Sequence, residues 1–255
     1  MERVGIVPFD QIEQKMSLWK TIKRQARLIQ RTLNDSLNGR LQKIALVQTG
    51  GLPDWPARLS IAQPVLPGPT VHNKRHNIQL ACERISRVVV QPGQIFSFWK
   101  TVGPPTAKRG FLPSRNIIGG RLSEDIGGGL CQVSGLLYLL SLRGGMQVLE
   151  RHAHSVDIYR EEERYAPLGA DATVVYGYKD YRFLNPFQHP LMITFSMAEH
   201  SVTAHLSSPF MIVEQQIVFE RHQTGGEEYV ITKVITAHGE QILGMSRYQK
   251  LHTPE

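Results

Sequence analysis

Cysteine is scarce in this chain, because only Cys82 and Cys131 occur among its 255 residues. Two cysteines so far apart match neither the framework of a disulfide-rich domain nor the closely spaced pairs of a zinc module. Cys82 shares a helical face with Ile78, Ala81 and Ile85, so we expect it to be a buried core residue. Cys131 instead follows a run of glycines, which indicates a different role.

Long apolar runs are also absent from the sequence. No segment reaches the roughly 18 apolar residues of a membrane-spanning helix, and the N-terminus lacks the apolar stretch of a signal peptide. The sequence contains no internal repeat and no low-complexity tract. We therefore expect a cytoplasmic protein that can attach peripherally to the inner face of the membrane.

The composition is that of an ordinary globular protein with an excess of positive charge. Hydrophobic residues make up 41% of the chain, which is enough for a substantial core. Lysine and arginine number 29 against 22 acidic residues, and the resulting net charge of +7 favours anionic partners. Nucleic acid is not the expected partner, because the basic residues gather in one helix without an aromatic-basic recognition motif.

Apolar residues at spacings of three and four predict a helix over residues 9–36. The basic residues of this segment lie off the apolar stripe: Lys15, Lys20, Lys23, Arg24, Arg27 and Arg31. Two interpretations fit this pattern. The helix either lies on an anionic membrane surface or packs on the protein with its basic face in water.

The order of the predicted elements indicates an α+β fold. Residues 1–70 combine the basic helix with a proline-rich linker, and residues 71–255 form the main domain. In that domain we expect a helix over 73–89, a central helix opened by a glycine-rich turn, and an antiparallel sheet in the C-terminal half. The strands are expected at 95–99, 116–122 (a hairpin), 147–150 and 152–159 (one or two strands), 172–178, 181–184, 191–196, 201–206, and 214–220 paired with 229–235.

The most informative stretch is Gly127, Gly128 and Gly129, followed closely by Cys131. The apolar segment that begins there has the length of a helix and ends at a pair of glycines. A thiol at the start of a helix lies in the positive field of the N-terminal N–H groups, which favours the reactive thiolate. The glycines allow a substrate or a backbone segment to approach closely.

A candidate base and a candidate carboxylate follow Cys131 along the chain. His152 and His154 would point to the same face of a strand, and Asp171 opens the next expected strand. This arrangement predicts Cys131 as nucleophile, His154 as base and Asp171 as the group that orients the imidazole. Transglutaminase-like and papain-type thiol enzymes use the same order of groups, which is an analogy of order alone.

Further residues near the thiol are candidates for substrate binding, together with the glycine run and His152. Gln132 and Ser134 flank Cys131, and amides near a helix start can stabilise an oxyanion. Arg115 and Arg121 precede the glycine run and are suited to bind a carboxylate or a phosphate.

Each of these residues also has a structural interpretation. Cys131 can pack the first helical turn against the sheet, His154 can bond to the backbone, and Asp171 can form a turn. A zinc site made of Cys131, His152 and His154 lacks an evident fourth ligand. We therefore expect neither a metal nor a cofactor.

Four motifs together resemble those of the VanW family, which is named for an accessory protein of vancomycin-resistance gene clusters. They are PGQIFSFW at 92–99, GGGLCQVS at 127–134, ERHAHS at 150–155 and DATV at 171–174. The resemblance covers roughly residues 72–200 and implies a bacterial protein linked to glycopeptide resistance or to the cell envelope. The motif residues of the family fall on Cys131, His154 and Asp171.

Two functions follow as hypotheses. The first is thiol-dependent acyl transfer or amide cleavage on a cell-envelope component, such as a peptidoglycan precursor. The alternative is a non-enzymatic module that holds an anionic or peptide-like envelope ligand through its glycine-rich loop and arginines. Nothing in the sequence indicates an oligomeric state.

Overall fold

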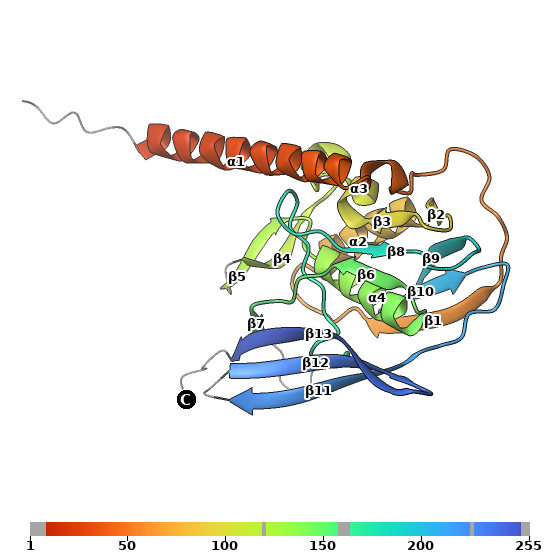
Figure 1. The fold of residues 1–255 in the computed structure, drawn as a ribbon. Coiled ribbons are helices and arrows are strands. Elements are labelled where there is room, and N and C mark those ends of the chain that lie inside the picture. The colour runs from red at the N-terminus through yellow and green to blue at the C-terminus, as the bar shows by residue number, and fades with distance from the viewer. Residues whose placement is uncertain (1–8, 119–120, 158–163, 225–226, 251–255) are drawn as a thin grey trace, which may run out of the picture.

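The computed structural model describes residues 9–118, 121–157, 164–224 and 227–250 (Figure 1). The helices in these ranges are α1 (Phe9–Leu37), α2 (Val71–Ile85), α3 (Phe98–Val102) and α4 (Leu130–Arg143), with short 3₁₀ helices at Leu41–Lys43 and Ala107–Arg109. The strands are β1 (Ala57–Pro64), β2 (Val89–Val90), β3 (Ile95–Ser97), β4 (Pro113–Ile118), β5 (Arg121–Ile126), β6 (Gln147–Glu150), β7 (Val156–Asp157), β8 (Arg182–Leu184), β9 (Leu191–Met197), β10 (Ser201–Ser207), β11 (Gln216–Thr224), β12 (Glu227–Thr236) and β13 (Gly239–Lys250). The concentration of antiparallel strands in the C-terminal half confirms the predicted α+β class.

The body of the protein is built around α4, which is apolar on nearly all sides. Leu136, Leu137 and Leu140 are fully buried there, because α2 and two sheets surround the helix. One sheet has the strand order β1-β10-β9-β2 and the other has the order β3-β8-β6. Cys82 of α2 belongs to the same core and is 4% exposed, which confirms its prediction as a buried core residue.

β1 lies inside the segment that was expected to be a linker. It pairs with β10 over seven residue pairs, from Ala57 opposite Ser207 to Pro64 opposite Ser201. Alternate side chains of β1 are buried, and Leu59 and Ile61 are among them. Residues 57–64 are therefore part of a sheet of the body rather than a connection between two regions.

The last three strands form a separate sheet at the edge of the body, drawn in blue in Figure 1. β11 pairs with β12 from Gln216 opposite Ile235 to Thr224 opposite Glu227, which confirms the predicted pairing. β13 was not predicted, and it extends this sheet and also pairs in parallel with β7. A small second core of Leu168, Val230 and Tyr248 fills the space beneath this sheet. β13 thereby carries Tyr248 toward the centre of the molecule.

One predicted strand is wrong, and another is only partly present. Residues 172–178 form no strand, and a single bridge joins Val175 to Lys179. Of the expected strand 152–159, residues 152–155 are irregular, β7 covers Val156–Asp157, and residues 158–159 lie outside the described part of the chain. The expected strand over 95–99 ends at Ser97, because the Ser97 side chain accepts a hydrogen bond from the N–H of Lys100 and caps α3.

Helix α1 confirms the prediction over residues 9–36 and lies along one side of the body (Figure 1). Its C-terminal half is held by ion pairs, of which the pair between Asp35 and Arg182 is buried. Arg182 Nη1 donates to both carboxylate oxygens of Asp35, at 2.8 and 2.9 Å. In the ranges that the structure describes, no helix is both long enough and apolar enough to cross a bilayer.

Candidate functional site

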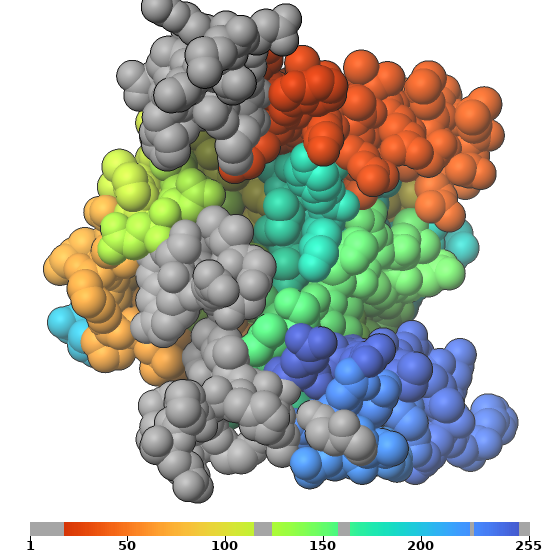
Figure 2. Space-filling model, turned by 90° about the vertical axis from the view of Figure 1, so that its left-hand side faces the viewer, coloured from red at the N-terminus to blue at the C-terminus, as the bar shows by residue number. Residues whose placement is uncertain are grey.

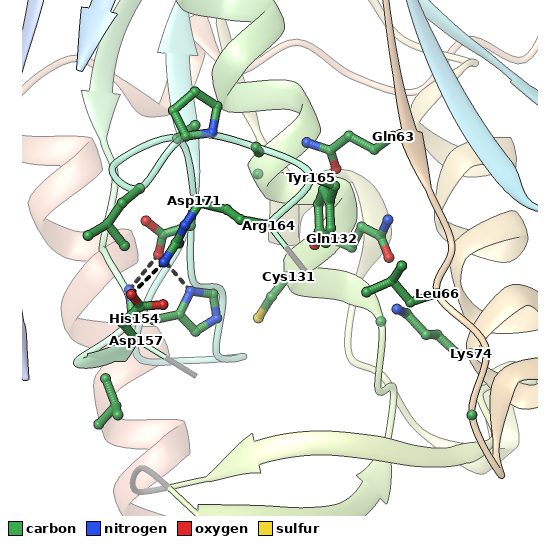
Figure 3. A pocket seen from close by; sticks show the side chains of 18 of the residues that line it. Gln63, Leu66, Lys74, Cys131, Gln132, His154, Asp157, Arg164, Tyr165 and Asp171 are labelled. Atoms are coloured by element: carbon green, nitrogen blue, oxygen red, sulfur yellow. Dashed lines mark hydrogen bonds and ion pairs between the residues drawn. The ribbon is translucent and has the colours of Figure 1, made fainter. Parts of the chain in front are cut away.

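A pocket of about 540 Å³ lies where α4 begins (Figure 3). Its walls come from the end of β1 and the loop after it, the first turns of α2 and α4, β7, residues 164–171 and Tyr248 of β13. Cys131, His154 and Asp171 all line it. The structure thus brings the three predicted chemical groups into one cavity.

Cys131 lies in the first turn of α4, directly after a glycine turn. Gly127 and Gly129 have φ values of 90° and 101°, in the left-handed region that glycine tolerates and other residues rarely adopt. Gly129 is the N-cap of the helix, so the thiol lies beside the N–H groups of the first helical turn. The thiol is partly exposed and its Sγ is 3.8 Å from the carbonyl oxygen of Val174.

Asn77 of α2 holds the glycine turn in place. Its side-chain nitrogen donates to the carbonyl oxygens of Leu112 and Gly128, at 2.9 and 3.0 Å, and its oxygen accepts from the N–H of Leu112 at 2.8 Å. Asn77 is fully buried, so water does not compete for these bonds. This residue fixes where α4 starts and hence where the thiol is placed.

Gly129→Ala is expected to destabilise the protein by about 2 kcal/mol, because an L side chain is strained at this φ. A Cβ atom there would also lie 2.9 Å from Cγ of Lys74 and 3.3 Å from its carbonyl oxygen. Urea unfolding of the variant gives the change in free energy. Gly50→Ala is the matched control, since a Cβ at Gly50 meets no atom within 4 Å. Equal stability of the two variants would contradict the expectation.

His154 and Asp171 meet because a backbone hydrogen bond sets two irregular segments side by side. The N–H of Thr173 donates to the carbonyl of His152 at 2.6 Å, so two residues further on His154 falls opposite Asp171. Asp171 Oδ2 then accepts from the backbone N–H of His154 at 2.7 Å and lies 2.6 Å from Nδ1 of its ring. Figure 3 shows the ring between Asp171 and the Cys131 side chain.

Helix α4 also holds the segment that carries Asp171. The Ser134 hydroxyl donates to the carbonyl of Ala172 at 2.6 Å. Gly135 packs against the same segment, since a Cβ atom there would be in van der Waals contact with the Cα of Asp171, at 3.7 Å. One turn of α4 thus presents the thiol, and the next turn anchors the carboxylate segment.

The surroundings of His154 favour its protonated form. Burial alone lowers the pKa of the imidazole, but hydrogen bonds with Asp171 and with the Cys131 side chain, together with their charges, raise it to about 10. Burial raises the pKa of Asp171, and the hydrogen bond with His154 and the charge of Arg151 outweigh this and hold the pKa far below its usual range. The site therefore keeps a carboxylate and an imidazolium next to a thiol.

Arg151 binds the carboxylate oxygen of Asp171 that His154 does not contact. Its Nη2 donates to Oδ1 of Asp171 at 2.9 Å and to the carbonyl of Gly169 at 2.8 Å. Its guanidinium lies over the ring of Tyr138, with 4.8 Å between Cζ and the ring centroid. The Tyr248 hydroxyl donates to the same carboxylate oxygen at 2.5 Å. Asp171 is thus fixed by four donors and has a defined orientation toward His154.

The other residues predicted for substrate binding take different places. Of the three glycines only Gly129 lines the pocket. Gln132 lines it too, but its Nε2 donates to the carbonyl of Pro64 at 2.8 Å and ties α4 to β1. Ser134 is fully buried and does not line the pocket. Arg115 and Arg121 belong to β4 and β5, and their side chains lie outside the described part of the structure.

His152 does not line the pocket. Its Nε2 lies 2.9 Å from Glu150, which is part of the ion-pair network under α1. The expectation that His152 and His154 share a face was wrong, because residues 151–155 are irregular and the two-residue periodicity of a strand does not hold there. Across the described residues, no group of three or more His, Cys, Asp or Glu side chains is arranged to bind a metal ion.

Sequence reasoning missed Arg151 and Tyr248, the partners of Asp171. Arg151 stands next to His152 in the motif at 150–155, and the guanidinium group is suited to bind a carboxylate such as Asp171. Tyr248 lies 77 residues beyond Asp171 in the chain, and no local pattern marks it. Its role depends on β13, which was not predicted.

Comparison with known proteins identifies the family. The family described as VanW like protein matches residues 73–207. The Uncharacterized protein YoaR of Bacillus subtilis is 39% identical over 121 residues, which are 48% of this chain and 38% of that protein. The Vancomycin B-type resistance protein VanW of Enterococcus faecalis is 25% identical over 163 residues, which are 62% of this chain and 59% of that protein.

The matched regions thus span less than two thirds of the length of either relative. No solved structure matches the chain. The matched residues 73–207 include most of α2, the glycine turn, Cys131, His154 and Asp171, and they make up more than half of the sequence. The chain therefore belongs to the VanW-like protein family.

Proposed function

We propose that this protein is a thiol-dependent acyltransferase or amidase that acts on a peptide-like component of the bacterial cell envelope. The observation that carries the proposal is the pocket in which Cys131, His154 and Asp171 meet, with 2.6 Å between His154 Nδ1 and Asp171 Oδ2. A nucleophile, a base and a group that orients the base are the parts that acyl transfer requires. The link to the cell envelope rests on the likeness to a protein named for vancomycin resistance.

The proposed reaction begins with the Cys131 thiolate and the His154 imidazolium. The sulfur attacks the carbonyl carbon of an amide, and a C–S bond forms as the C–N bond breaks. The imidazolium gives its proton to the departing amine, so a thioester and a neutral imidazole remain. Water or an amine then attacks the thioester, the imidazole takes the proton of the attacking group, and the thiolate leaves.

Asp171 and the start of α4 support these steps. Asp171 stabilises the imidazolium and holds its Nδ1–H, which directs Nε2 toward the reacting atoms. The oxyanion that forms on attack lies close to the first-turn N–H groups of α4, whose partial positive charge stabilises it. Gln132 is not proposed as an oxyanion donor, because its Nε2 is bonded to Pro64.

The pocket walls fit a peptide-like chain. Apolar side chains of Leu66, Val71 and Leu168 line the cavity, and so do Asp157 and Arg164, which form an ion pair at 2.6 Å. A cavity of about 540 Å³ holds a ligand of the size of a few amino acids. Such mixed walls suit short peptides with both apolar and charged groups.

Incubation with soluble muropeptides is expected to add an acyl mass to Cys131, detected by mass spectrometry of the intact protein. Hydroxylamine should remove the adduct, because it cleaves thioesters. Cys131→Ala is expected to form no adduct, and Cys82→Ala, the matched control, is expected to form it normally since Cys82 is buried in the core.

Two results would count against the proposal. One is a native protein that forms no adduct and leaves the muropeptides unchanged. The other is equal processing by native protein and Cys131→Ala. Muropeptide binding without any turnover, at equal affinity in both proteins, would support the alternative of a non-enzymatic binding module.

A further inference from the structure

Helix α1 contacts the body of the protein through its polar side, and its apolar side faces away from the body. The residues directed at the body are less exposed than their neighbours and are mostly polar: Arg24, Leu28, Arg31, Thr32 and Asp35. Six large apolar residues between positions 18 and 37 are instead at least half exposed: Leu18, Trp19, Ile22, Ile29, Leu33 and Leu37. A surface helix of a globular protein normally has the reverse orientation, with its apolar stripe toward the core.

Ion pairs explain the orientation of α1. Arg31 Nη2 lies 2.5 Å from Glu150, and Asp35 accepts two hydrogen bonds from Arg182. Arg182 is also bonded to Asp180 at 2.8 Å, and the hydrogen bonds to these carboxylates raise its pKa although burial lowers it. The network fixes which side of the helix meets the body, and it leaves the apolar stripe uncovered.

The stripe and its charged border form one continuous surface. It spans about 28 Å from Leu18 to Leu37 at the rise of an α-helix. Lys20, Lys23 and Arg27 are exposed along one side of it. Asp35 is the single acidic residue between positions 18 and 37, and it is buried in its ion pair. The exposed charge of this part of α1 is therefore entirely positive.

We propose that the outward face of α1, defined by these six apolar residues and three basic residues, binds the surface of an anionic lipid bilayer. The apolar side chains would enter the boundary between headgroups and acyl chains, and the basic side chains would lie at the level of the anionic headgroups. The helix lies flat in this arrangement, with the body on the side away from the lipid. In Figure 2 α1 (red) lies at the opposite end of the molecule from the β11–β13 sheet (blue).

The charge distribution favours lipid over a second copy of the chain. Two α1 helices packed by their apolar stripes would bring two sets of lysine and arginine together, which is unfavourable. An anionic surface satisfies the apolar stripe and the basic border at once. Lipid binding is independent of the chemistry at Cys131, because the outward face of α1 contains no residue of the pocket.

Co-sedimentation of the full chain with vesicles tests the proposal. The protein is expected to bind vesicles that contain about 30% phosphatidylglycerol at low salt and to be released by about 0.5 M NaCl, since salt screens the basic side chains. Binding to pure phosphatidylcholine should be at least tenfold weaker. Trp19 is 62% exposed, so its fluorescence should shift to shorter wavelength on binding. Trp19→Phe should remove most of that shift.

Two pairs of variants make the test specific. Ile22→Gln, Ile29→Gln and Leu33→Gln together should weaken binding at least tenfold. The matched control Met211→Gln, Ile242→Gln and Met245→Gln changes three apolar residues elsewhere that are more exposed still, and it should bind normally. Lys20→Gln with Lys23→Gln should reduce binding severalfold, whereas Lys43→Gln with Lys108→Gln, at exposed positions outside α1, should not.

Circular dichroism should show unchanged folding in all four variants, because every substituted residue is exposed. The proposal would be overturned by a native protein that does not bind anionic vesicles at low salt. It would equally be overturned by control variants that lose as much binding as the α1 variants. A dimer that the α1 apolar substitutions dissociate, without vesicle binding, would assign the surface to a second copy of the chain instead.

Discussion

Iodoacetamide is expected to alkylate Cys131 at pH 6.5 about fivefold faster than it alkylates a free thiol. The reason is its surroundings, because the Cys131 side chain lies in the first turn of α4 and beside the protonated ring of His154, an environment typical of reactive cysteines. Peptide mass mapping over time measures the rate at each cysteine.

His154→Gln is expected to bring the rate at Cys131 down to that of a free thiol or below. The difference between native protein and variant should be largest below pH 8 and should disappear toward pH 10. The reason is that the raised pKa of His154, about 10, keeps the imidazolium charged throughout the lower range. Cys82 is the internal control, since burial raises the pKa of its thiol and it should stay unmodified in the folded protein.

A rate at Cys131 that is equal in native protein and His154→Gln across this pH range would show that the imidazole does not activate the thiol. Modification of Cys82 at a similar rate would show instead that the protein had unfolded in the assay. The two outcomes are distinguished by the same mass map.

Asp171→Asn is expected to lower the free energy of unfolding by about 3 kcal/mol, at the lower end of the cost of removing one partner of a buried ion pair, because the Asp171 side chain is 27% exposed. Arg151, whose side chain is 10% exposed, would lose its carboxylate, and His154 would lose the acceptor of its ring N–H. An amide nitrogen in place of one carboxylate oxygen would also face donors rather than acceptors. Urea unfolding at pH 7 measures the change in stability.

The difference in stability between the native protein and Asp171→Asn should decrease as the pH falls. The pKa of Asp171 is lower in the folded protein than in the unfolded chain, where it is about 3.9. The native protein should therefore exceed Asp171→Asn in free energy of unfolding by the full amount above this pH, and the difference should shrink as the pH falls below it. Asp54→Asn, at an exposed position, is the matched control and should leave stability nearly unchanged. A variant Asp171→Asn as stable as this control would contradict the role assigned to the carboxylate.

The features that could be predicted from sequence have strong local signals. Helix α1 follows from spacings of three and four, and α4 follows from an apolar segment between glycines. The proposed site residues come together although one argument for them was wrong. Asp171 does not open a strand. A single backbone hydrogen bond between Thr173 and His152 aligns the two segments, which a pair of strands was expected to align.

The features that could not be predicted depend on contacts between distant segments. Five prolines between positions 50 and 69 suggested a linker, but only Pro64 falls within β1, at its last residue. Residues 172–178 have the composition of a strand, yet their neighbours are α4 and the segment before β7 rather than a sheet edge. The orientation of α1 depends on Arg182, which is 147 residues from Asp35.

The position of Tyr248 on β13 has a consequence for the order in which the protein folds. The buried residues of the core around α4 all precede position 213, and of the later residues Ile217 and Phe219 of β11 pack against it, partly buried. Asp171 receives the last of its four donors only when β13 has paired with β12 and β7 and brought Tyr248 into place. Such pairing between distant segments is a slow step in folding. During refolding, therefore, the fast alkylation of Cys131 should appear only after the core has formed. Its appearance should coincide with the packing of the β11–β13 sheet onto the body.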